Sequence, residues 1–441
     1  MQYPLHERIG EPELLVGREK EFKLLDKWIS GIPRRISKSR AILGRRKSGK
    51  TSIVQRIFNR LWSENREVIP FYYNFPEQKI WYPNLAVEYY RTFASHYISF
   101  LERDEKLIMN PLTLDQIHAY GLSQSLAPLV TDSEQMHKLR DRGDYDILWR
   151  TAYSAPERYA AVFDRRILVI LDEFQNVGST VYRDEQCERA HDETVPGSWH
   201  EHSESKIAPM LVTGSYVGWI LNIISKWFEG GRLKIYEISP YLEPEEGLRA
   251  VYRYAQYYNE PLTNETAFLI NDLCMCDPFF ISCVIGSDFE VKDLNTETGV
   301  IDAVHYEITN RESEMSKTWG EYIELTLKRV NDIHAKTILL HLSKHPEQEW
   351  TPKTLKEHLN LSISEKEIHD RLRILVSADV IAEGPADIDY HGLRDGTLNL
   401  ILRNRFEKEI CTFGAPDLKK EFADEIERLK KDRKSLQEPE I

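Results

Sequence analysis

Residues 44 to 51 read GRRKSGKT and lie between the apolar run AIL and a helix-forming stretch that begins SIVQRIF. The segment matches the pattern G-x-x-x-x-G-K-[ST] at every fixed position. Its glycines allow the loop to curl so that consecutive backbone N–H groups point at one centre, and the following helix adds the positive end of its dipole. A strand, a basic glycine-containing loop and a helix in this order predict a phosphate-binding loop in an α/β fold.

Each position of the loop has an expected role toward a nucleoside triphosphate. We expect Lys50 to reach the β- and γ-phosphates and the Thr51 hydroxyl to bind Mg²⁺. The extra charges of the loop have two interpretations, because they either contact phosphate or balance acidic helices nearby. The residues expected to line the nucleotide are Gly44, Arg45, Arg46, Lys47, Ser48, Gly49, Lys50, Thr51 and Ser52.

A second acidic element follows the apolar run ILVIL at 167–171. The run is typical of a central parallel strand, and Asp172 and Glu173 come at its end. We expect Asp172 to bind the Mg²⁺ shell and Glu173 to polarise the attacking water as a general base; as an alternative, such a pair caps a helix. Thr213 and Ser215 end the next strand, LVTGS, and a polar side chain there either lies beside Glu173 and the γ-phosphate or belongs to an ordinary turn at Gly214.

Apolar segments at 41–44, 66–75, 167–174, 209–215 and 232–240 read as strands that alternate with helical patterns. This alternation predicts a doubly wound, mostly parallel sheet with helices on both faces. The expected division is a core at 1–242 with insertions near 102–145 and 178–205, a helical segment at 243–330, a three-helix-plus-hairpin segment at 331–412 that resembles a winged helix, and a charged helical tail at 413–441.

Composition limits the environment and the partners. A chain of 441 residues is long enough for two or three domains, and its net charge of -13 opposes broad attraction to nucleic acid or anionic membrane. No window is apolar for the length of a membrane span, and MQYPLHERIG lacks the apolar core of a signal peptide. The five scattered cysteines suit reduced thiols. These features predict a cytoplasmic protein.

Five segments together resemble a known family: VGREKEF, GRRKSGKTS, LDEFQNV, VTGSYVG and GGRLKIYEISPY. They are similar to the prokaryotic ATPases often called the archaeal ATPase family, which belongs with the AAA+ and STAND-type P-loop ATPases. The resemblance covers roughly residues 10 to 290, and more weakly the winged helix. It implies a P-loop ATPase core, a helical lid at 243–330, a winged-helix domain, and ATP or ADP with Mg²⁺ as cofactors.

The resemblance also implies further site residues. It places an arginine that acts on a nucleotide, in the same chain or in a neighbour, at Arg232. CDPFF at 276–280 is similar to the lid motif of the family, in which Pro278 would sense the base, although Cys276 replaces the glycine of that motif. The residues that it places near the adenine are Leu15, Val16, Gly17 and Arg18.

We therefore expect an ATP-hydrolysing conformational switch, slow or stimulated by a partner, that binds a protein or a second copy of itself. The alternative is a DNA-associated AAA+ ATPase, a loader or motor that binds DNA through the winged helix. The helix SEKEIHDRLRIL in that segment nearly balances acids and bases, whereas a helix that faces phosphates should be clearly positive. A third possibility is a scaffold that binds nucleotide without turnover.

Overall fold

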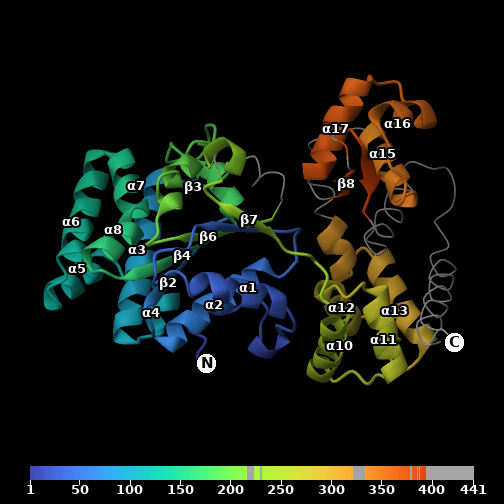
Figure 1. The fold of residues 1–441 in the computed structure, drawn as a ribbon, viewed down its shortest axis with the longest axis horizontal. Coiled ribbons are helices and arrows are strands. Elements are labelled where there is room, and N and C mark those ends of the chain that lie inside the picture. Colours follow the sequence, from blue (N-terminus) through green and yellow to red (C-terminus); the bar gives the residue numbers. More distant parts are fainter. Residues whose placement is uncertain are drawn as a thin grey trace. The chain divides into compact units, whose positions relative to one another are not determined.

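The computed structural model describes residues 1–215, 223–228, 231–320, 333–377, 380–384, 386 and 388–393 (Figure 1). They form two compact units, one of Met1–Leu15 with Glu19–Ile238, the other of Val16–Arg18 with the described residues from Ser239 onward. The first unit ends four residues before the expected core boundary at 242. The tripeptide 16–18 belongs to the second unit by its contacts.

The first unit contains the predicted sheet. Five strands, all parallel to their neighbours, lie in the order β2-β4-β6-β1-β7. Each of the five expected strand segments forms one of them, so the predicted α/β fold with a central parallel sheet is confirmed. The bounds are β1 (Arg40–Leu43), β2 (Val68–Asn74), β4 (Arg166–Asp172), β6 (Met210–Gly214) and β7 (Lys234–Glu237).

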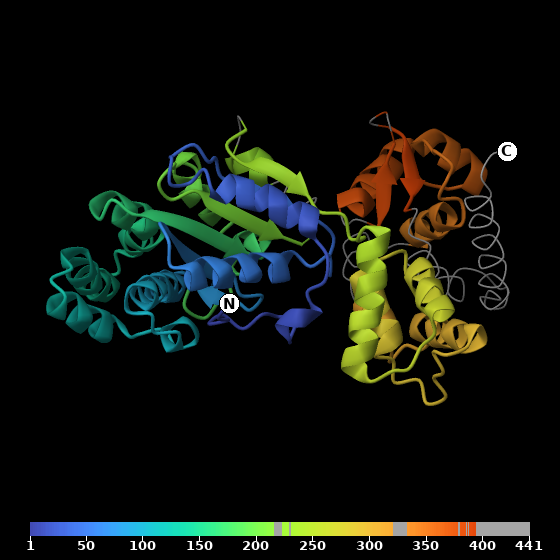
Figure 2. The same ribbon diagram turned by 60° about the horizontal axis from the view of Figure 1, so that its bottom comes forward.

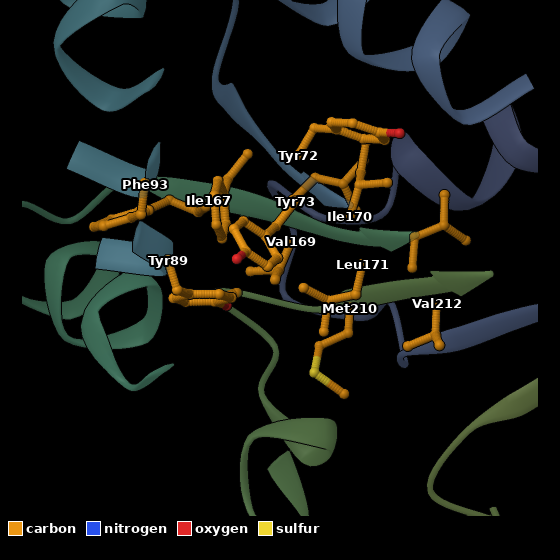
Figure 3. Close-up of a cluster of buried hydrophobic side chains, with 14 of the residues drawn as sticks. Tyr72, Tyr73, Tyr89, Phe93, Ile167, Val169, Ile170, Leu171, Met210 and Val212 are labelled. Carbon is orange, nitrogen blue, oxygen red and sulfur yellow. The ribbon is translucent and has the colours of Figure 1, made fainter. Parts of the chain in front are cut away.

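Helices cover both faces of the sheet (Figure 2). Along β2, the Phe71 ring packs against Phe93 of α3 (Tyr82–Glu102), whereas the next side chain, Tyr72, packs against Phe58 of α2 (Lys50–Glu64). Successive side chains of a strand point to opposite faces, so α2 and α3 lie on opposite sides of the sheet. Figure 3 shows Tyr72 on one side of the strands and Tyr89 of α3 on the other. The apolar run in β4 follows from this double burial.

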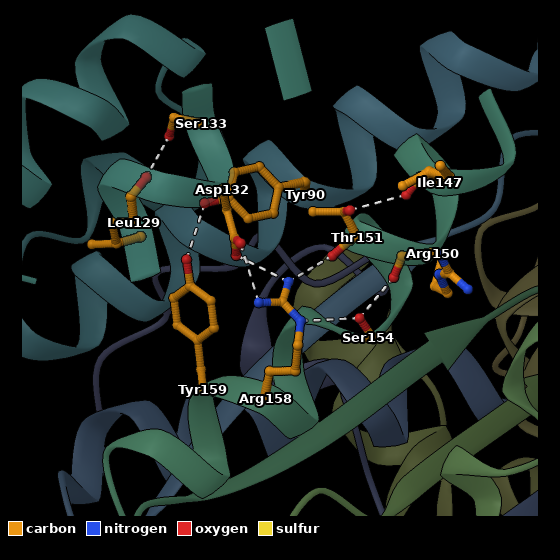
Figure 4. Close-up of polar contacts among 10 residues, drawn as sticks. All are labelled: Tyr90, Leu129, Asp132, Ser133, Ile147, Arg150, Thr151, Ser154, Arg158 and Tyr159. Carbon is orange, nitrogen blue, oxygen red and sulfur yellow. Dashed lines mark hydrogen bonds and ion pairs between the residues drawn. The ribbon is translucent and has the colours of Figure 1, made fainter. Parts of the chain in front are cut away.

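The insertion expected at 102–145 is helical, as predicted. It contains α4 (Lys106–Met109), α5 (Leu114–Ser123) and α6 (Ala127–Arg142), and α7 (Tyr145–Tyr153) and α8 (Ala155–Val162) follow it. Asp132 of α6 is 3% exposed and forms two hydrogen bonds of 3.1 and 3.0 Å with the Arg158 guanidinium of α8 (Figure 4). Burial raises the pKa of Asp132 even though Arg158 partly offsets it. This pair fastens α6 to α8.

The segment between Asp172 and β6 is mostly irregular. It contains the 3₁₀ helices η2 (Phe174–Gly178), η3 (Val195–Trp199) and η4 (His202–Glu204) and the short strand β5 (Val181–Tyr182). β5 pairs with β3 (Ile80–Trp81) in a separate parallel ribbon. At the start of the unit lie η1 (Pro12–Leu14) and α1 (Glu19–Ile29).

His96 of α3 predicts a pH dependence of stability. Its ring is 2% exposed, packs 5.2 Å from the Phe58 ring centre, and accepts the Tyr72 backbone N–H at Nδ1 (3.3 Å). Burial lowers the pKa of His96 to about 4. The unfolded chain therefore takes up this proton first as the pH falls, so the stability present above pH 6.5 is lost between 6.5 and 4, by about 1 kcal/mol at pH 5.5.

Denaturant unfolding at a series of pH values checks this. In His96→Asn the side-chain oxygen still accepts the Tyr72 N–H, so the variant should be less stable overall because of the smaller side chain but should lose less stability on acidification than the wild type. If the wild type and His96→Asn lost the same stability between pH 7.5 and 5.5, His96 would not be the group responsible for the pH dependence.

The second unit begins with helices, as expected for 243–330: α10 (Pro244–Tyr258), α11 (Asn264–Leu273), α12 (Pro278–Ile285) and α13 (Glu297–Thr309). Three further helices and an antiparallel hairpin follow in the expected order: α15 (Ile333–Lys344), α16 (Pro352–Leu359), α17 (Glu365–Ser377), β8 (Ile381–Glu383) and β9 (Tyr390–Gly392). Their identity as a winged helix stays a prediction, and the tail at 413–441 lies outside the described residues. No helix in the described part of the chain is long and apolar enough to cross a membrane.

Cys276 occupies a backbone position suited to glycine. Its φ is +58°, and its N–H and C=O are tied to Asn271 and Leu242 by backbone hydrogen bonds of 2.9 Å each. A left-handed conformation costs a non-glycine residue about 1–2 kcal/mol. This is the position at which the related lid motif has glycine.

Replacing Cys276 with glycine should therefore raise the free energy of unfolding by about 0.5–1 kcal/mol, since glycine adopts positive φ without this cost but loses more backbone entropy on folding. Denaturant unfolding measures it. In the matched control, Cys274→Gly, a buried side chain is lost at a φ of -85°, and stability should fall. A destabilised Cys276→Gly would mean that packing of the thiol outweighs the backbone strain.

Candidate nucleotide-binding site

The loop at 44–49 connects β1, which lies between β6 and β7, to the first turn of α2. Two of its glycines are required by different constraints. A Cβ on Gly44 would lie 2.9 Å from the Ile238 carbonyl oxygen, so a larger residue does not fit. Gly49 precedes the helix with φ +84°, a conformation strained for L residues. The fixed positions of the motif thus correspond to real geometric demands.

Lys50 closes the loop from inside. Lys50 is only 5% exposed. Its ammonium donates to the carbonyl oxygens of Gly44 and Arg45 at 2.8 Å each, and to Ser48 Oγ at 3.3 Å. A buried ammonium with these contacts lies where the loop would hold an anion. Arg45 is also buried, whereas Arg46 is half-buried and Lys47 is exposed.

The helix start fits a phosphate group. The first hydrogen bond of α2 runs from the Ile53 N–H to the Gly49 carbonyl at 3.0 Å, and the N–H groups of the first turn of a helix point out of its end. These groups and the dipole of a 15-residue helix favour an anion at this end. Thr51 and Ser52 are half-buried in the same turn.

Asp172 ends β4 and is fully buried. Thr213 Oγ1 and the Glu173 backbone N–H (3.1 Å) donate to its Oδ1, and the Tyr72 hydroxyl donates to its Oδ2 at 2.8 Å. The register brings these groups together, since Asn74 of β2 lies beside Asp172 and Val212 of β6 lies beside Leu171. The carboxylate is therefore stabilised and oriented, as a ligand of a metal shell must be.

Glu173 adopts a left-handed conformation, with φ +51° and ψ +43°. Strain of this kind occurs disproportionately at functional sites. Ser215 Oγ donates to Glu173 Oε1 at 3.3 Å, and Gln175 Nε2 donates to Oε2. The structure thus brings Ser215, the residue directly after β6, to the carboxylate of Glu173.

Sequence reasoning missed two of these residues. Tyr72 lies within an aromatic strand run that carries no motif, and its contact with Asp172 spans 100 positions in the chain. Gln175 is the second residue after the acidic pair, and its polar side chain in LDEFQ was the one available signal of a contact with Glu173.

Arg232 does not lie near the loop of its own chain. Lys234 is level with Arg40 in the pairing of β7 with β1, while the loop follows Leu43 at the other end. Arg232 is therefore about six residues, or about 20 Å, from the level of Gly44, farther than an arginine side chain spans. Its Nη1 instead pairs with Glu204 Oε2 at 3.0 Å. Arg232 thus precedes β7, as the resemblance implies, and its action on a nucleotide, in the same chain or in a neighbour, stays a prediction.

The residues expected near the adenine make contacts of their own in the structure. Leu15 is half-buried in the first unit. In the second unit, the Arg18 guanidinium donates to the carbonyl oxygens of Ser239 (2.6 Å) and Pro240 (3.1 Å), and a Cβ on Gly17 would lie 3.0 Å from Glu246. Pro278 is the first residue of α12, with φ suited to that position. Adenine contacts by Leu15, Val16, Gly17, Arg18 and Pro278 stay predictions.

The sequence matches no protein-family model, and no curated protein matches it. Solved structures do match. The Walker-type ATPase PABY2304 of Pyrococcus abyssi is 15% identical, with a TM-score of 0.58, and the match covers 91% of this chain and 98% of that one. The Aeropyrum pernix ORC2 protein (ADPNP–ADP complexes) matches at 13% identity and a TM-score of 0.46, covering 92% and 99%, and the Thermotoga maritima RuvB Holliday junction branch migration motor at 12% and 0.38, covering 88% and 96%. The five-stranded parallel sheet and the match to the Walker-type ATPase show that this chain shares the α/β fold of that protein.

Proposed function

We propose that this protein binds ATP with Mg²⁺ at the loop 44–52, hydrolyses it, and uses the cycle as a conformational switch. One observation carries the proposal. The loop after β1, the pair Asp172 and Glu173 after β4, and Ser215 after β6 come from three adjacent parallel strands. The carboxyl ends of adjacent parallel strands lie at one edge of a sheet, where α/β proteins bind their ligands.

The donor set fits a magnesium nucleotide. Backbone N–H groups of the loop and Lys50 would bind the β- and γ-phosphates, and the Thr51 hydroxyl and Asp172 would hold Mg²⁺. The metal would supply neutralisation of charge on the phosphate oxygens. A hydroxyl and an oriented carboxylate are oxygen donors of the kind that Mg²⁺ prefers.

Glu173 supplies the group that distinguishes hydrolysis from binding alone. As a general base it would accept a proton from the attacking water, and Ser215 and Gln175 would hold its carboxylate in a set direction. Leu15, Val16, Gly17, Arg18 and Pro278 would contact the adenine. Arg232 would act only on the nucleotide of a neighbouring copy, which requires self-association.

The test measures released inorganic phosphate from ATP with and without Mg²⁺, and the mass of the protein with and without ATP. A parallel series contains double-stranded DNA. Magnesium-dependent turnover supports the proposal, and a larger assembly with ATP supports a role for Arg232 in a neighbour. Turnover that DNA stimulates in a salt-sensitive manner favours the DNA-associated alternative. Nucleotide binding without turnover in every series would overturn hydrolysis and favour a scaffold.

A further inference from the structure

The first residues of the chain lie along α2, the helix that carries Lys50 and Thr51. Three polar side chains one turn apart on α2, Gln55, Asn59 and Ser63, bind the backbone of this segment, which we call the N-terminal strap (Gln2–Arg8). Ser63 exchanges hydrogen bonds of 2.8 and 2.9 Å with the N–H and C=O of Gln2. Asn59 does the same with Leu5 at 2.9 and 2.8 Å.

The remaining contact of the strap leads to the candidate site. The Arg8 backbone N–H donates to Gln55 Oε1 at 2.8 Å. Because a backbone N–H can only donate, the Gln55 amide must turn its oxygen to the strap and its NH₂ away from it. That NH₂ lies 3.5 Å from the Tyr72 hydroxyl, the longest contact of the series, and Tyr72 donates to Asp172 Oδ2 at 2.8 Å. All three groups therefore donate in one direction, from the strap to Asp172.

This direction is enforced at Tyr72. The carboxylate of Asp172 can only accept hydrogen bonds, so the Tyr72 hydroxyl must point its hydrogen at Oδ2. The oxygen of this hydroxyl is then left to accept a hydrogen bond from Gln55. Gln55 and Tyr72 are 4% and 7% exposed, and water does not replace these contacts readily.

Tyr72 donates to the Asp172 oxygen that has fewer hydrogen-bond donors among the described residues. A carboxylate oxygen accepts about two hydrogen bonds. Oδ1 already has two donors among the described residues, Thr213 and the Glu173 N–H, whereas Oδ2 has one, Tyr72. The free lone pair that can face a metal-bound water is thus on Oδ2, and the Tyr72 hydroxyl sets its direction.

We propose that Tyr72 is a positioning residue for the metal-binding carboxylate, and that the N-terminal strap supports it through Gln55. This inference rests on the proposed function at Asp172 and extends it to a segment that precedes the phosphate loop by more than 30 residues. The strap would thereby affect the magnesium site indirectly, through Gln55 and Tyr72.

The test measures binding of a fluorescent ADP analogue as Mg²⁺ is varied, which does not depend on turnover. Tyr72→Phe should raise the Mg²⁺ concentration for half-maximal effect by about 10-fold, as loss of a partner of a metal ligand typically does. Affinity without Mg²⁺ should stay within about 2-fold, since the hydrogen bonds described for the Tyr72 hydroxyl go to Gln55 and Asp172 and not to the loop that would bind phosphate. Tyr73→Phe is the matched control, because Tyr73 is the adjacent buried tyrosine but its hydroxyl donates to Glu88 at 3.3 Å.

The contribution of the strap is tested at Arg8. Gly10 N–H bonds to Glu7 C=O at 3.0 Å, so Arg8 is the second residue of a four-residue turn, where proline is tolerated. Arg8→Pro removes the N–H that Gln55 accepts, and Arg8→Ala loses the same side chain but keeps the N–H. The proline variant should raise the Mg²⁺ requirement by about 3-fold over the alanine variant, the effect of one hydrogen bond.

The outcomes separate the two levels of inference. If the wild type binds no nucleotide, the proposed function fails. If the wild type binds nucleotide with a Mg²⁺ dependence that Tyr72→Phe leaves unchanged or shares with Tyr73→Phe, the role of Tyr72 is overturned while the site stands. If Tyr72→Phe raises the Mg²⁺ requirement but Arg8→Pro and Arg8→Ala have the same requirement, Tyr72 positions Asp172 without the strap. The second half of the proposal is then overturned. Thermal unfolding of each variant confirms that it is folded.

Discussion

Replacing Lys50 with alanine is expected to weaken ATP binding by at least about 100-fold and to reduce phosphate release to background. Hydrogen bonds that involve a charged group contribute about 1.5–3 kcal/mol each, and Lys50 would make two or more to the β- and γ-phosphates, so a loss of about 3 kcal/mol corresponds to this factor. Titration calorimetry with a slowly hydrolysed ATP analogue measures the affinity. The variant also removes the bonds to the Gly44 and Arg45 carbonyls, so a lower melting temperature is expected without nucleotide.

The matched control is Lys47→Ala, in the same loop and with the same change of charge. Lys47 is exposed, whereas Lys50 is buried among the carbonyl groups of the loop. We expect its affinity for ATP to fall by less than about 5-fold, because an exposed charge is screened by solvent. Equal losses in the two variants would mean that the loop attracts nucleotide by net charge alone, and the specific role of Lys50 would be wrong.

Replacing Glu173 with glutamine is expected to slow hydrolysis by about 10²–10⁴-fold, because general base catalysis contributes this much. ATP affinity should stay near that of the wild type, since the two side chains have the same shape. The site can accommodate the new amide. Gln175 Oε1 is buried without a hydrogen-bond partner among the described residues, so rotation of the Gln175 amide lets it accept from the glutamine at 173.

Single-turnover hydrolysis and calorimetry together separate the two effects. Glu88→Gln is a suitable control, as Glu88 is a carboxylate of α3 in the same unit that accepts only the Tyr73 hydroxyl among the hydrogen bonds of its side chain described here. It should turn over ATP at the wild-type rate. If Glu173→Gln also retained that rate, the attacking water would be activated by another group, and the assignment of Glu173 would fall.

The local chemistry of the candidate site could be predicted from short segments. GRRKSGKT contains its own geometric requirements, because Gly49 needs positive φ and Gly44 leaves no room for a side chain. The run ILVIL before Asp172 and Glu173 indicated a strand buried on both faces, since only such a strand is continuously apolar. The alternation of such strands with helices then predicted the parallel sheet.

The partners of those residues could not be predicted. Tyr72 meets Asp172 because β2 and β4 pair in one register, and a shift of one residue would turn Tyr72 to the opposite face. For Arg232 the resemblance implied the place before the last strand, but only the strand pairing shows how far that place lies from the loop of the same chain.

The sequence by itself thus determined the fold class and the candidate loop and acidic pair, because each depends on neighbouring residues and on periodicity. Only the tertiary structure decided which side chains orient Asp172 and Glu173 and that the N-terminal strap lies on α2. The physical reason is that these contacts, apart from that of Gln175 with Glu173, join residues 40 to 100 positions apart, and they exist only once strand register and helix packing have brought the segments together.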